Sequence, residues 1–258
     1  MPQSNRLFYF SHGAENVTRP PLVFIHGAGG THLHWPPQVR RMVGQRILAL
    51  DLPGHGKSGG VGSQNIADYA SAIVDFLDAV KLNAAVFIGH SMGSAIAITL
   101  ALNFPKRVLG LGLVGSGARL RVSLQILEST ATEANFPMAV KLINDAEFSP
   151  TVNPHLKELA AQRMAEIRPS VLHGDFLACN EFDVMQRLGE ISAPTLILCG
   201  TDDQMTPMRY SEFLHDRIPT SHLVTFPGAG HMVMLEQPDE VAKALSAFAD
   251  EILYRPGQ

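Results

Sequence analysis

Short β-branched or aromatic runs alternate along this chain with longer segments of helical period. Six of the short runs predict strands: Leu22–Ile25, Arg46–Leu50, Ala85–Ile88, Val108–Val114, Thr195–Leu198 and Leu223–Phe226. Repeated alternation of strands with helices is typical of a parallel sheet that carries helices on both faces. The pattern therefore predicts an α/β fold with a mostly parallel central sheet.

Two of the intervening segments have clear amphipathic stripes, in which apolar residues recur every three or four positions. The first stripe comprises Ile66, Tyr69, Ile73, Phe76, Leu77 and Val80, and the second comprises Val241, Leu245, Phe248 and Ile252. This spacing places each set on one side of a helix. The second helix is expected to begin near Pro238, because proline is well suited to the first helical turn.

The alternation stops between Arg119 and Arg187, where no strand-like run occurs. Several helical pieces follow one another there, separated by four prolines, Pro137, Pro150, Pro154 and Pro169. We therefore expect residues 119–187 to form a helical insertion over one end of the sheet. Residues 1–118 and 188–258 would form the core, without a linker that separates independent domains.

Composition supports one globular chain with a sizeable core. Of the 258 residues, 46% are hydrophobic and 17% are charged, which excludes a disordered chain. The 20 basic and 24 acidic residues give a net charge of −4 and form no basic stripe, so nucleic acid is not an expected partner.

The length of the apolar segments and the number of cysteines bear on the cellular location of the protein. The longest apolar stretch is far shorter than the roughly 20 residues that span a bilayer, so no membrane insertion is expected. Met1–Phe10 lacks the apolar core and cleavage site of a signal peptide. Cys179 and Cys199 are expected to be buried free thiols. These observations predict a cytoplasmic protein.

The strongest chemical signal is the segment Gly89-His90-Ser91-Met92-Gly93. It follows a predicted strand and precedes a helix-forming run. A serine at a sharp strand-to-helix turn is strained and needs glycine neighbours, and its hydroxyl then projects above the sheet edge. An ordinary turn with two glycines is the alternative, but the flanking strand and helix favour Ser91 as a nucleophile.

A serine hydroxyl is a weak nucleophile, so it needs a histidine to accept its proton and a carboxylate to orient that histidine. His231 lies in a turn directly after the strand 223–226, which places it at the carboxyl end of the sheet with Ser91. His90 is adjacent to Ser91 in sequence, so its side chain must point away from the serine. His231 is therefore the predicted general base.

Two aspartates compete for the role of the orienting acid. Asp202 and Asp203 both follow the strand 195–198, again at the carboxyl end of the sheet. The segment from Gly115 to Leu127 contains no acid, which removes the other plausible place for a triad carboxylate. The residues alone leave both aspartates open.

Backbone amides are expected to stabilise the oxyanion that forms during acyl transfer. The glycine-rich segment His26–Gly30 follows the strand Leu22–Ile25 and can turn the amide of Ala28 towards the nucleophile. The amide of Met92 is the second expected donor. A flexible glycine turn without this function is the alternative for the segment.

Together these motifs resemble the α/β-hydrolase superfamily, specifically its small capped, carboxylesterase-like members with a His-Gly-x-Gly oxyanion loop. The resemblance rests on His26–Gly30, Asp51–Ser58, Gly89–Gly93, Gly200–Pro207 and Gly228–Pro238, in that order. It implies the α/β-hydrolase fold, with a helical cap inserted after the sixth strand. It also favours Asp203, which lies four positions before a proline, and gives the triad order Ser91, Asp203, His231.

The resemblance implies that a small or medium carboxylic ester is cleaved through an acyl-enzyme, with neither a cofactor nor a metal. Carbon–carbon bond hydrolase, lactonase, thioesterase and hydroxynitrile lyase are alternatives on the same triad. A small-molecule receptor with slow or no turnover is the alternative of another class. The substrate, the acyl-chain length and the choice between monomer and homodimer stay open.

Two weaker patterns could suggest a cofactor or a metal. Gly54–Gly59 matches a dinucleotide-binding pattern by letter, but further glycines follow and no helix opens at its third glycine. His32 and His34 are two residues apart, but no acidic or histidine ligands follow nearby. We expect neither segment to bind a cofactor or a metal.

Overall fold

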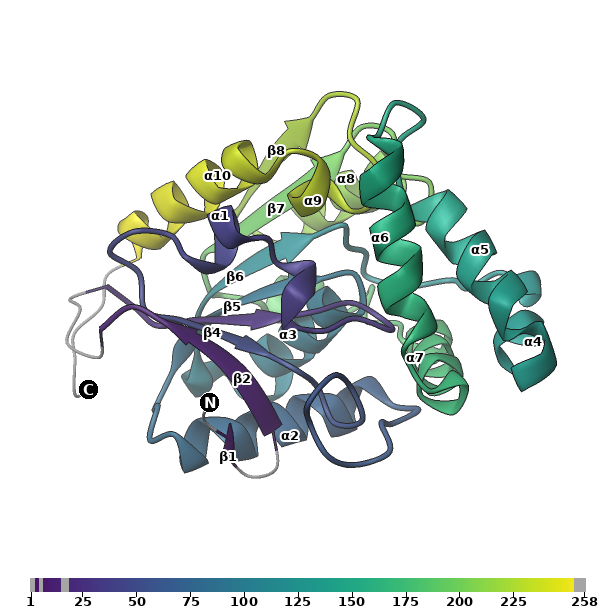
Figure 1. Ribbon diagram of the computed structural model, residues 1–258. Helices are drawn as coiled ribbons and strands as arrows, with labels where there is room; N and C mark the ends of the chain where they lie inside the picture. The colour runs from purple at the N-terminus through teal and green to yellow at the C-terminus, as the bar shows by residue number, and fades with distance from the viewer. Residues whose placement is uncertain (1–2, 5–6, 15–18, 253–258) are drawn as a thin grey trace.

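The computed structural model describes residues 3–4, 7–14 and 19–252 of the chain, and it contains an eight-stranded sheet (Figure 1). The strand order is β1-β2-β4-β3-β5-β6-β7-β8, in which β1 and β2 are antiparallel to their neighbours and the others are parallel. The bounds are β1 Gln3–Ser4, β2 Leu7–His12, β3 Leu22–Ile25, β4 Ile47–Leu50, β5 Ala85–His90, β6 Val108–Val114, β7 Thr195–Gly200 and β8 Ser221–Phe226.

All six predicted strands are present, and the mostly parallel sheet is confirmed. β5 and β7 each extend two residues beyond the predicted end, to His90 and Gly200. The sequence pattern did not predict β1 and β2. In β2, Phe10 pairs with Ala49 of β4, which gives the sheet its antiparallel part.

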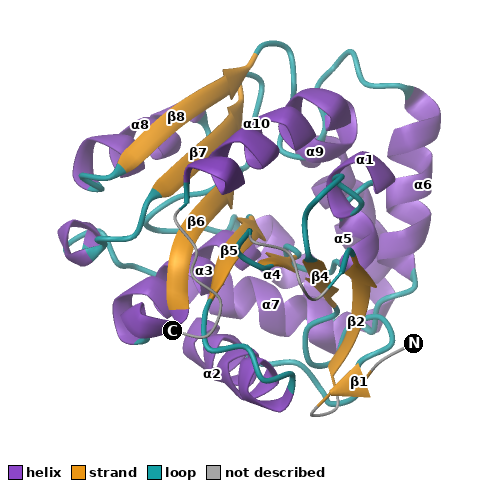
Figure 2. Ribbon diagram, turned by 90° about the vertical axis from the view of Figure 1, so that its left-hand side faces the viewer, coloured by secondary structure: helices purple, strands orange, loops and turns teal. Residues whose placement is uncertain are grey.

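Helices cover both faces of the sheet (Figures 1 and 2). On one face lie α2 (Ile66–Ala79), α3 (Met92–Asn103) and α8 (Met208–Arg217), and on the other lie α1 (Pro37–Arg40) and α10 (Pro238–Glu251). Both predicted stripes are therefore helical except for their last residues, Val80 and Ile252, which directly follow α2 and α10. Pro238 is the first residue of α10.

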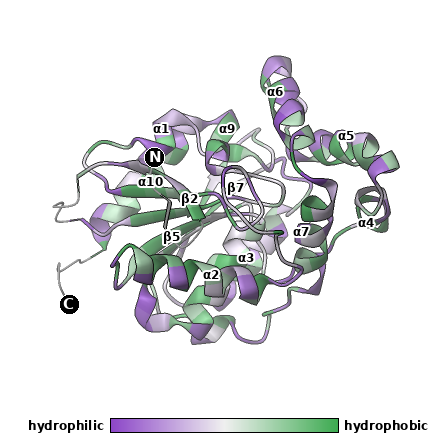
Figure 3. Ribbon diagram, turned by 60° about the horizontal axis from the view of Figure 1, so that its bottom comes forward, coloured by the Kyte–Doolittle hydropathy of each residue, from purple (hydrophilic) through white to green (hydrophobic). Residues whose placement is uncertain are grey.

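Side chains alternate along each strand between these two layers. Val23 and Ile25 of β3 pack in the core beneath α2 and α3, whereas Leu22 and Phe24 pack in the core beneath α10. In Figure 3 the central strands are green, and the helices around them carry hydrophilic positions as well. Burial on both faces explains why these strands are continuous apolar runs in the sequence.

Four helices lie between β6 and β7, beside the carboxyl ends of the parallel strands (Figure 1). They are α4 (Leu124–Thr130), α5 (Phe136–Glu147), α6 (Pro154–Ala165) and α7 (Pro169–Glu181). α6 and α7 both begin at a proline, as the missing amide of that residue favours. These helices share a small apolar cluster of their own, and one isolated β-bridge joins Arg119 to Asp183 at the two ends of the insertion.

The remaining helical turns are short: η1 His32–His34, η2 Pro105–Arg107, η3 Glu133–Asn135, η4 Leu188–Glu190 and α9 Val233–Glu236. Cys179 and Cys199 are both buried and free. Among the described residues, no helix combines the length and the apolar character that crossing a membrane requires.

Candidate active site

Ser91 occupies a strained turn between β5 and α3. Its φ of 53° and ψ of −114° make it one of two non-glycine residues with positive φ in the described part of the chain. A Cβ on Gly93 would lie 2.2 Å from the Ile25 carbonyl oxygen, and a Cβ on Gly89 would lie 2.2 Å from the Gly93 carbonyl oxygen. Both flanking residues must therefore be glycine.

Asp203 and His231 form a hydrogen-bonded pair at the carboxyl ends of β7 and β8. His231 Nδ1 lies 2.8 Å from Asp203 Oδ2, and both side chains are almost completely buried. The amides of Met205 and Thr206 donate to Asp203 Oδ1 at 2.9 and 2.8 Å. The Thr206 hydroxyl donates to Asp203 Oδ2 at 2.8 Å. The carboxylate is therefore held by three donors besides the imidazole.

The structure separates the two competing aspartates. Asp202 is exposed, and its carboxylate accepts a hydrogen bond from the neighbouring Thr201 hydroxyl at 3.1 Å. Only Asp203 reaches His231. Thr206, whose amide and hydroxyl both bind the Asp203 carboxylate, was not singled out from the sequence.

Electrostatics favour an ionised aspartate beside the histidine. Burial raises the pKa of Asp203, but the charge and hydrogen bond of His231 and the bonds from Thr206 outweigh it, so that pKa falls below its ordinary value. Burial lowers the pKa of His231, but the Asp203 carboxylate outweighs this effect and raises it. An Nδ1–H directed at Asp203 leaves Nε2 of the neutral imidazole free to accept a proton.

The serine and the histidine both adjoin the carboxyl end of β6. The Ser91 amide donates to the Val114 carbonyl oxygen at 2.9 Å. A Cβ on the next residue, Gly115, would lie 3.0 Å from the His231 ring. Within the described residues, no hydrogen bond yet joins the Ser91 hydroxyl to His231.

His90 is buried beneath this site. Its Nε2 lies 3.1 Å from the His231 carbonyl oxygen, and a Cβ on Gly27 would lie 2.8 Å from its Nδ1. Burial holds the pKa of His90 well below its ordinary value, with a further contribution from His231. A neutral His90 therefore supports the backbone of the site.

The glycine-rich loop His26–Gly30 passes over Ser91. A Cβ on Gly27 would lie 3.2 Å from the Ser91 Cβ. The Gly27 carbonyl oxygen accepts from His26 Nδ1 at 2.7 Å and from the Gly30 amide at 3.1 Å. His26 Nε2 in turn accepts from the Leu52 amide at 3.0 Å, so this ring is neutral with its proton on Nδ1.

Two amides near Ser91 are available as donors. The described residues contain no hydrogen-bond partner for the Ala28 amide. The Met92 amide belongs to the first turn of α3, where helical amides lack an intrahelical acceptor. Both predicted oxyanion donors thus lie on segments that adjoin Ser91.

The segment Asp51–Ser58 is a structural loop. Asp51 accepts hydrogen bonds from the His32 amide and ring at 2.7 and 2.8 Å and from the Lys57 amide at 2.9 Å. The Gly54 amide donates to the Gly59 carbonyl oxygen at 2.8 Å, which closes a turn where a dinucleotide site would open a helix. No group of three or more potential metal ligands occurs in the part of the chain described here.

A second buried network surrounds Asp175 of α7. Its Oδ2 accepts from the Gly29 amide at 2.8 Å and contacts His55 Nε2 at 2.7 Å. Its Oδ1 accepts from the Tyr69 hydroxyl at 2.6 Å. Asp175 was not predicted from the sequence, because the insertion carries no motif and a single acid within a helical pattern gives no local signal.

Glu147 is a second buried acid near the candidate site. Its carbonyl oxygen accepts from the Met232 amide at 3.0 Å, next to His231. Burial raises the pKa of its carboxyl to about 7, although the nearby His231 acts in the opposite direction. Its side chain lines a small cavity of about 30 Å³ together with His34, Met164 and Met232.

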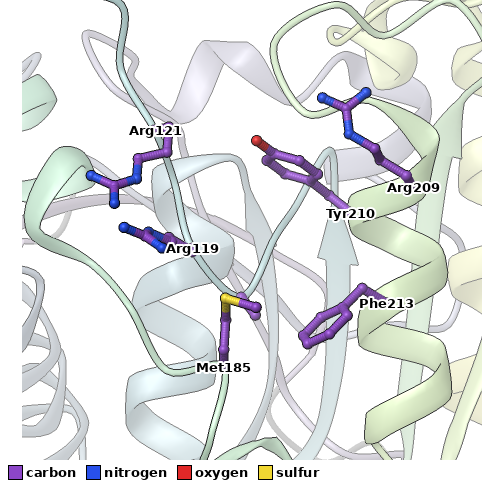
Figure 4. Close-up of a pocket in the computed structure, with 7 residues that line it drawn as sticks. Arg119, Arg121, Met185, Arg209, Tyr210 and Phe213 are labelled. Carbon is purple, nitrogen blue, oxygen red and sulfur yellow. The ribbon is translucent and has the colours of Figure 1, made fainter.

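A larger pocket of about 320 Å³ lies where the ends of the insertion meet α8 (Figure 4). Its walls are Ala118, Arg119, Arg121, Met185, Arg209, Tyr210 and Phe213. Arg119 and Arg121 stand opposite Tyr210 and Phe213 in this view. None of the predicted site residues lines this pocket.

Comparison with known proteins places the fold among hydrolases. The chain is 28% identical over 247 residues to 3-oxoadipate enol-lactonase 1 of Acinetobacter baylyi, which covers 93% of this chain and 92% of that protein. It is 28% identical over 240 residues to 2-hydroxy-6-oxo-6-phenylhexa-2,4-dienoate hydrolase of Burkholderia cepacia, which covers 84% and 83%.

A solved structure of a thermophilic esterase is also similar, with 34% identity and a TM-score of 0.82 over 95% of this chain and 98% of that chain. The sequence model of the alpha/beta hydrolase family matches residues 22–244. That range runs from the first residue of β3 into α10, so it includes every residue of the candidate site. The chain belongs to the alpha/beta hydrolase family.

Proposed function

We propose that this protein is a serine hydrolase that cleaves a small or medium carboxylic ester through an acyl-enzyme. One observation carries the proposal. The strained Ser91 turn adjoins the same strand end as a buried imidazole whose Nδ1 is hydrogen-bonded to Asp203 at 2.8 Å. A nucleophile, a base and an orienting acid in this arrangement are the requirements of nucleophilic acyl transfer.

In the proposed reaction, Ser91 Oγ attacks the ester carbonyl carbon while His231 Nε2 accepts the hydroxyl proton. The ionised Asp203 stabilises the imidazolium that forms. The amides of Ala28 and Met92 donate hydrogen bonds to the oxyanion of the tetrahedral intermediate. His231 then returns the proton to the leaving alcohol, and water repeats the sequence to release the acid.

We also propose that residues 119–187 act as a cap over this site, on a core formed by residues 1–118 and 188–258. The helices of this segment lie beside the carboxyl ends of the strands, and Met164 of α6 and Glu147 of α5 line the small cavity next to Met232. An acyl or alcohol group would therefore contact the inner surface of these helices.

A lactone is the second candidate substrate. The enol-lactonase relative covers most of this chain, and a lactone is an ester whose alcohol remains attached to the acyl group. The same triad chemistry would open the ring. An open-chain ester and a lactone would therefore need pockets of different shape but the same catalytic residues.

The nucleophile can be identified without a natural substrate. Diethyl p-nitrophenyl phosphate should phosphorylate Ser91 with release of one p-nitrophenolate per site, and intact-mass spectrometry and peptide mapping would locate the adduct. The Ser91→Ala variant should remain unmodified. An adduct at another residue, or equal labelling of Ser91→Ala, would refute the assignment of the nucleophile.

A further inference from the structure

The oxyanion loop is hydrogen-bonded to the helical insertion through Asp175. Asp175 lies in the middle of α7, is completely buried, and accepts a hydrogen bond from the Gly29 amide at 2.8 Å. Gly29 directly follows Ala28, and its φ is +63°. A Cβ on Gly29 would also lie 2.6 Å from Leu172 of α7, so the helix packs closely on the loop.

The Ala28 amide is oriented from both sides. It belongs to the Gly27–Ala28 peptide unit, whose carbonyl oxygen is held by His26 Nδ1 and the Gly30 amide. In a planar trans peptide the N–H points opposite to the C=O. The two hydrogen bonds to the Gly27 carbonyl oxygen therefore fix the direction of the Ala28 N–H. The hydrogen bond from the Gly29 amide to Asp175 fixes the next peptide unit, Ala28–Gly29. The peptide planes on both sides of the Ala28 Cα are therefore held in place.

The carboxylate is itself held in place by groups from two other segments. His55 contacts the same oxygen as Gly29, at 2.7 Å, and Tyr69 of α2 donates to the other oxygen at 2.6 Å. Burial lowers the pKa of His55, but the Asp175 carboxylate outweighs it and raises that pKa. A buried carboxylate with a cationic or donating partner on each oxygen has a single well-defined position.

We propose that Asp175 is a positioning residue for catalysis, through which helix α7 fixes the oxyanion loop in the conformation that presents the Ala28 amide. The inference rests on the proposed acyl transfer at Ser91. It makes the insertion part of the catalytic geometry as well as a wall of the substrate site. Asp175 does not touch the reacting atoms and acts only through Gly29.

The test compares Asp175→Ala with Asp175→Asn and with a control elsewhere in the insertion. Without the carboxylate the Gly29 amide loses its acceptor, so kcat for p-nitrophenyl butyrate should fall about 10- to 100-fold while KM changes less than about threefold. Asp175→Asn retains an oxygen that can accept from Gly29, so it should recover part of the loss. Ile143→Ala, in the apolar cluster of the insertion, should lower the unfolding temperature without this loss in kcat.

A trifluoromethyl ketone provides a second measurement that a merely structural role would not change. The Ser91 oxygen adds to its carbonyl and forms a tetrahedral hemiketal oxyanion, so its affinity reports the oxyanion donors directly. Its inhibition constant should rise in Asp175→Ala by about the same factor as kcat falls. If Asp175→Ala is too unstable to purify, Asp175→Asn should show a smaller parallel change in both quantities.

The inference is overturned if kcat falls in Asp175→Ala and Ile143→Ala alike, in proportion to lost stability. It is also overturned if the affinity of the ketone is unchanged in both Asp175 variants. Failure of the proposed function looks different, because the wild-type protein would then show no Ser91-dependent turnover and no hemiketal with the ketone.

Discussion

At the scale of single residues, the site depends on charges that are buried but partnered. An isolated carboxylate in an apolar interior would take up a proton, but Asp203 accepts three hydrogen bonds from residues 205 and 206 in addition to the His231 ring. Asp175 is likewise surrounded by donors. Glu147 differs, because burial raises the pKa of its carboxyl to about 7.

The two aspartates after β7 give the sharpest prediction at this scale. Asp203→Asn should lower kcat by about 10⁴, because an amide does not hold the imidazole tautomer or stabilise the imidazolium. Asp202→Asn changes an exposed side chain and should alter kcat less than about threefold. Steady-state hydrolysis of p-nitrophenyl butyrate by both variants tests this ranking, and the reverse ranking would transfer the acid's role to Asp202.

Glu147 predicts a pH dependence of folding stability. The pKa of this carboxyl is about 4.5 in an unfolded chain and about 7 in the folded one, so the folded state holds the proton more tightly. Its contribution is then most favourable below the unfolded pKa and is lost as the pH rises to about 7. A glutamine side chain does not ionise, so Glu147→Gln keeps this stability at high pH. Its unfolding free energy should exceed that of the wild type by about 3 kcal/mol at pH 8.

Urea denaturation of both proteins at pH 5 and pH 8 measures this difference. The gap in unfolding free energy between Glu147→Gln and the wild type should widen by about 2.5 kcal/mol between these two pH values, because most of the titration falls within that window. A gap that is equal at both pH values would show that the Glu147 carboxyl titrates normally in the folded protein.

At the scale of elements, glycines allow the site segments to approach one another. A Cβ on Gly93 would meet the Ile25 carbonyl oxygen at 2.2 Å, which is backbone that cannot move aside without shifting β3. Gly93→Ala should therefore lower the unfolding free energy by about 3 kcal/mol, the upper end of the cost of overpacking, and abolish esterase activity.

Gly189 supplies the matched control for this prediction. A Cβ at Gly189 would meet no atom within 4 Å, so Gly189→Ala should stay within about 0.5 kcal/mol of the wild type and keep its activity. Chemical denaturation and ester hydrolysis of the two variants give the comparison. Equal stability of Gly93→Ala and Gly189→Ala would mean that the turn tolerates a side chain.

The sequence predicted those elements whose signal is local. The strands β3–β7 are almost completely buried and mostly apolar, β8 contains the shorter run Leu223–Phe226, and α2 and α10 have regular stripes, so all were found. β2 was missed although it begins with Leu7–Phe10, an apolar and aromatic run of the kind that favours a strand. Ser91 and His231 each stand in a turn with a motif, whereas Asp175 meets Gly29 only through a contact between residues 146 positions apart.

At the scale of the whole molecule, the fold gathers chemistry at one end of the sheet. Parallel strands bring their carboxyl ends to one edge, and the turns after β3, β5, β7 and β8 carry the proposed oxyanion loop, Ser91, Asp203 and His231. The insertion between β6 and β7 lies at that same edge (Figure 1). In the proposed function the core therefore supplies the reacting groups, and the insertion is where substrate selection is expected to lie.

The most direct test of the central claim is stopped-flow release of p-nitrophenol from its acetate, butyrate and octanoate esters. An acyl-enzyme formed at Ser91 should give a burst equal to the concentration of sites, followed by steady turnover, and Ser91→Ala should lose both. The relative rates with the acetate, butyrate and octanoate esters would then indicate the size of the acyl pocket. Turnover that persists in Ser91→Ala, or the absence of release from every ester by the wild-type protein, would show that this protein is not an esterase with Ser91 as its nucleophile.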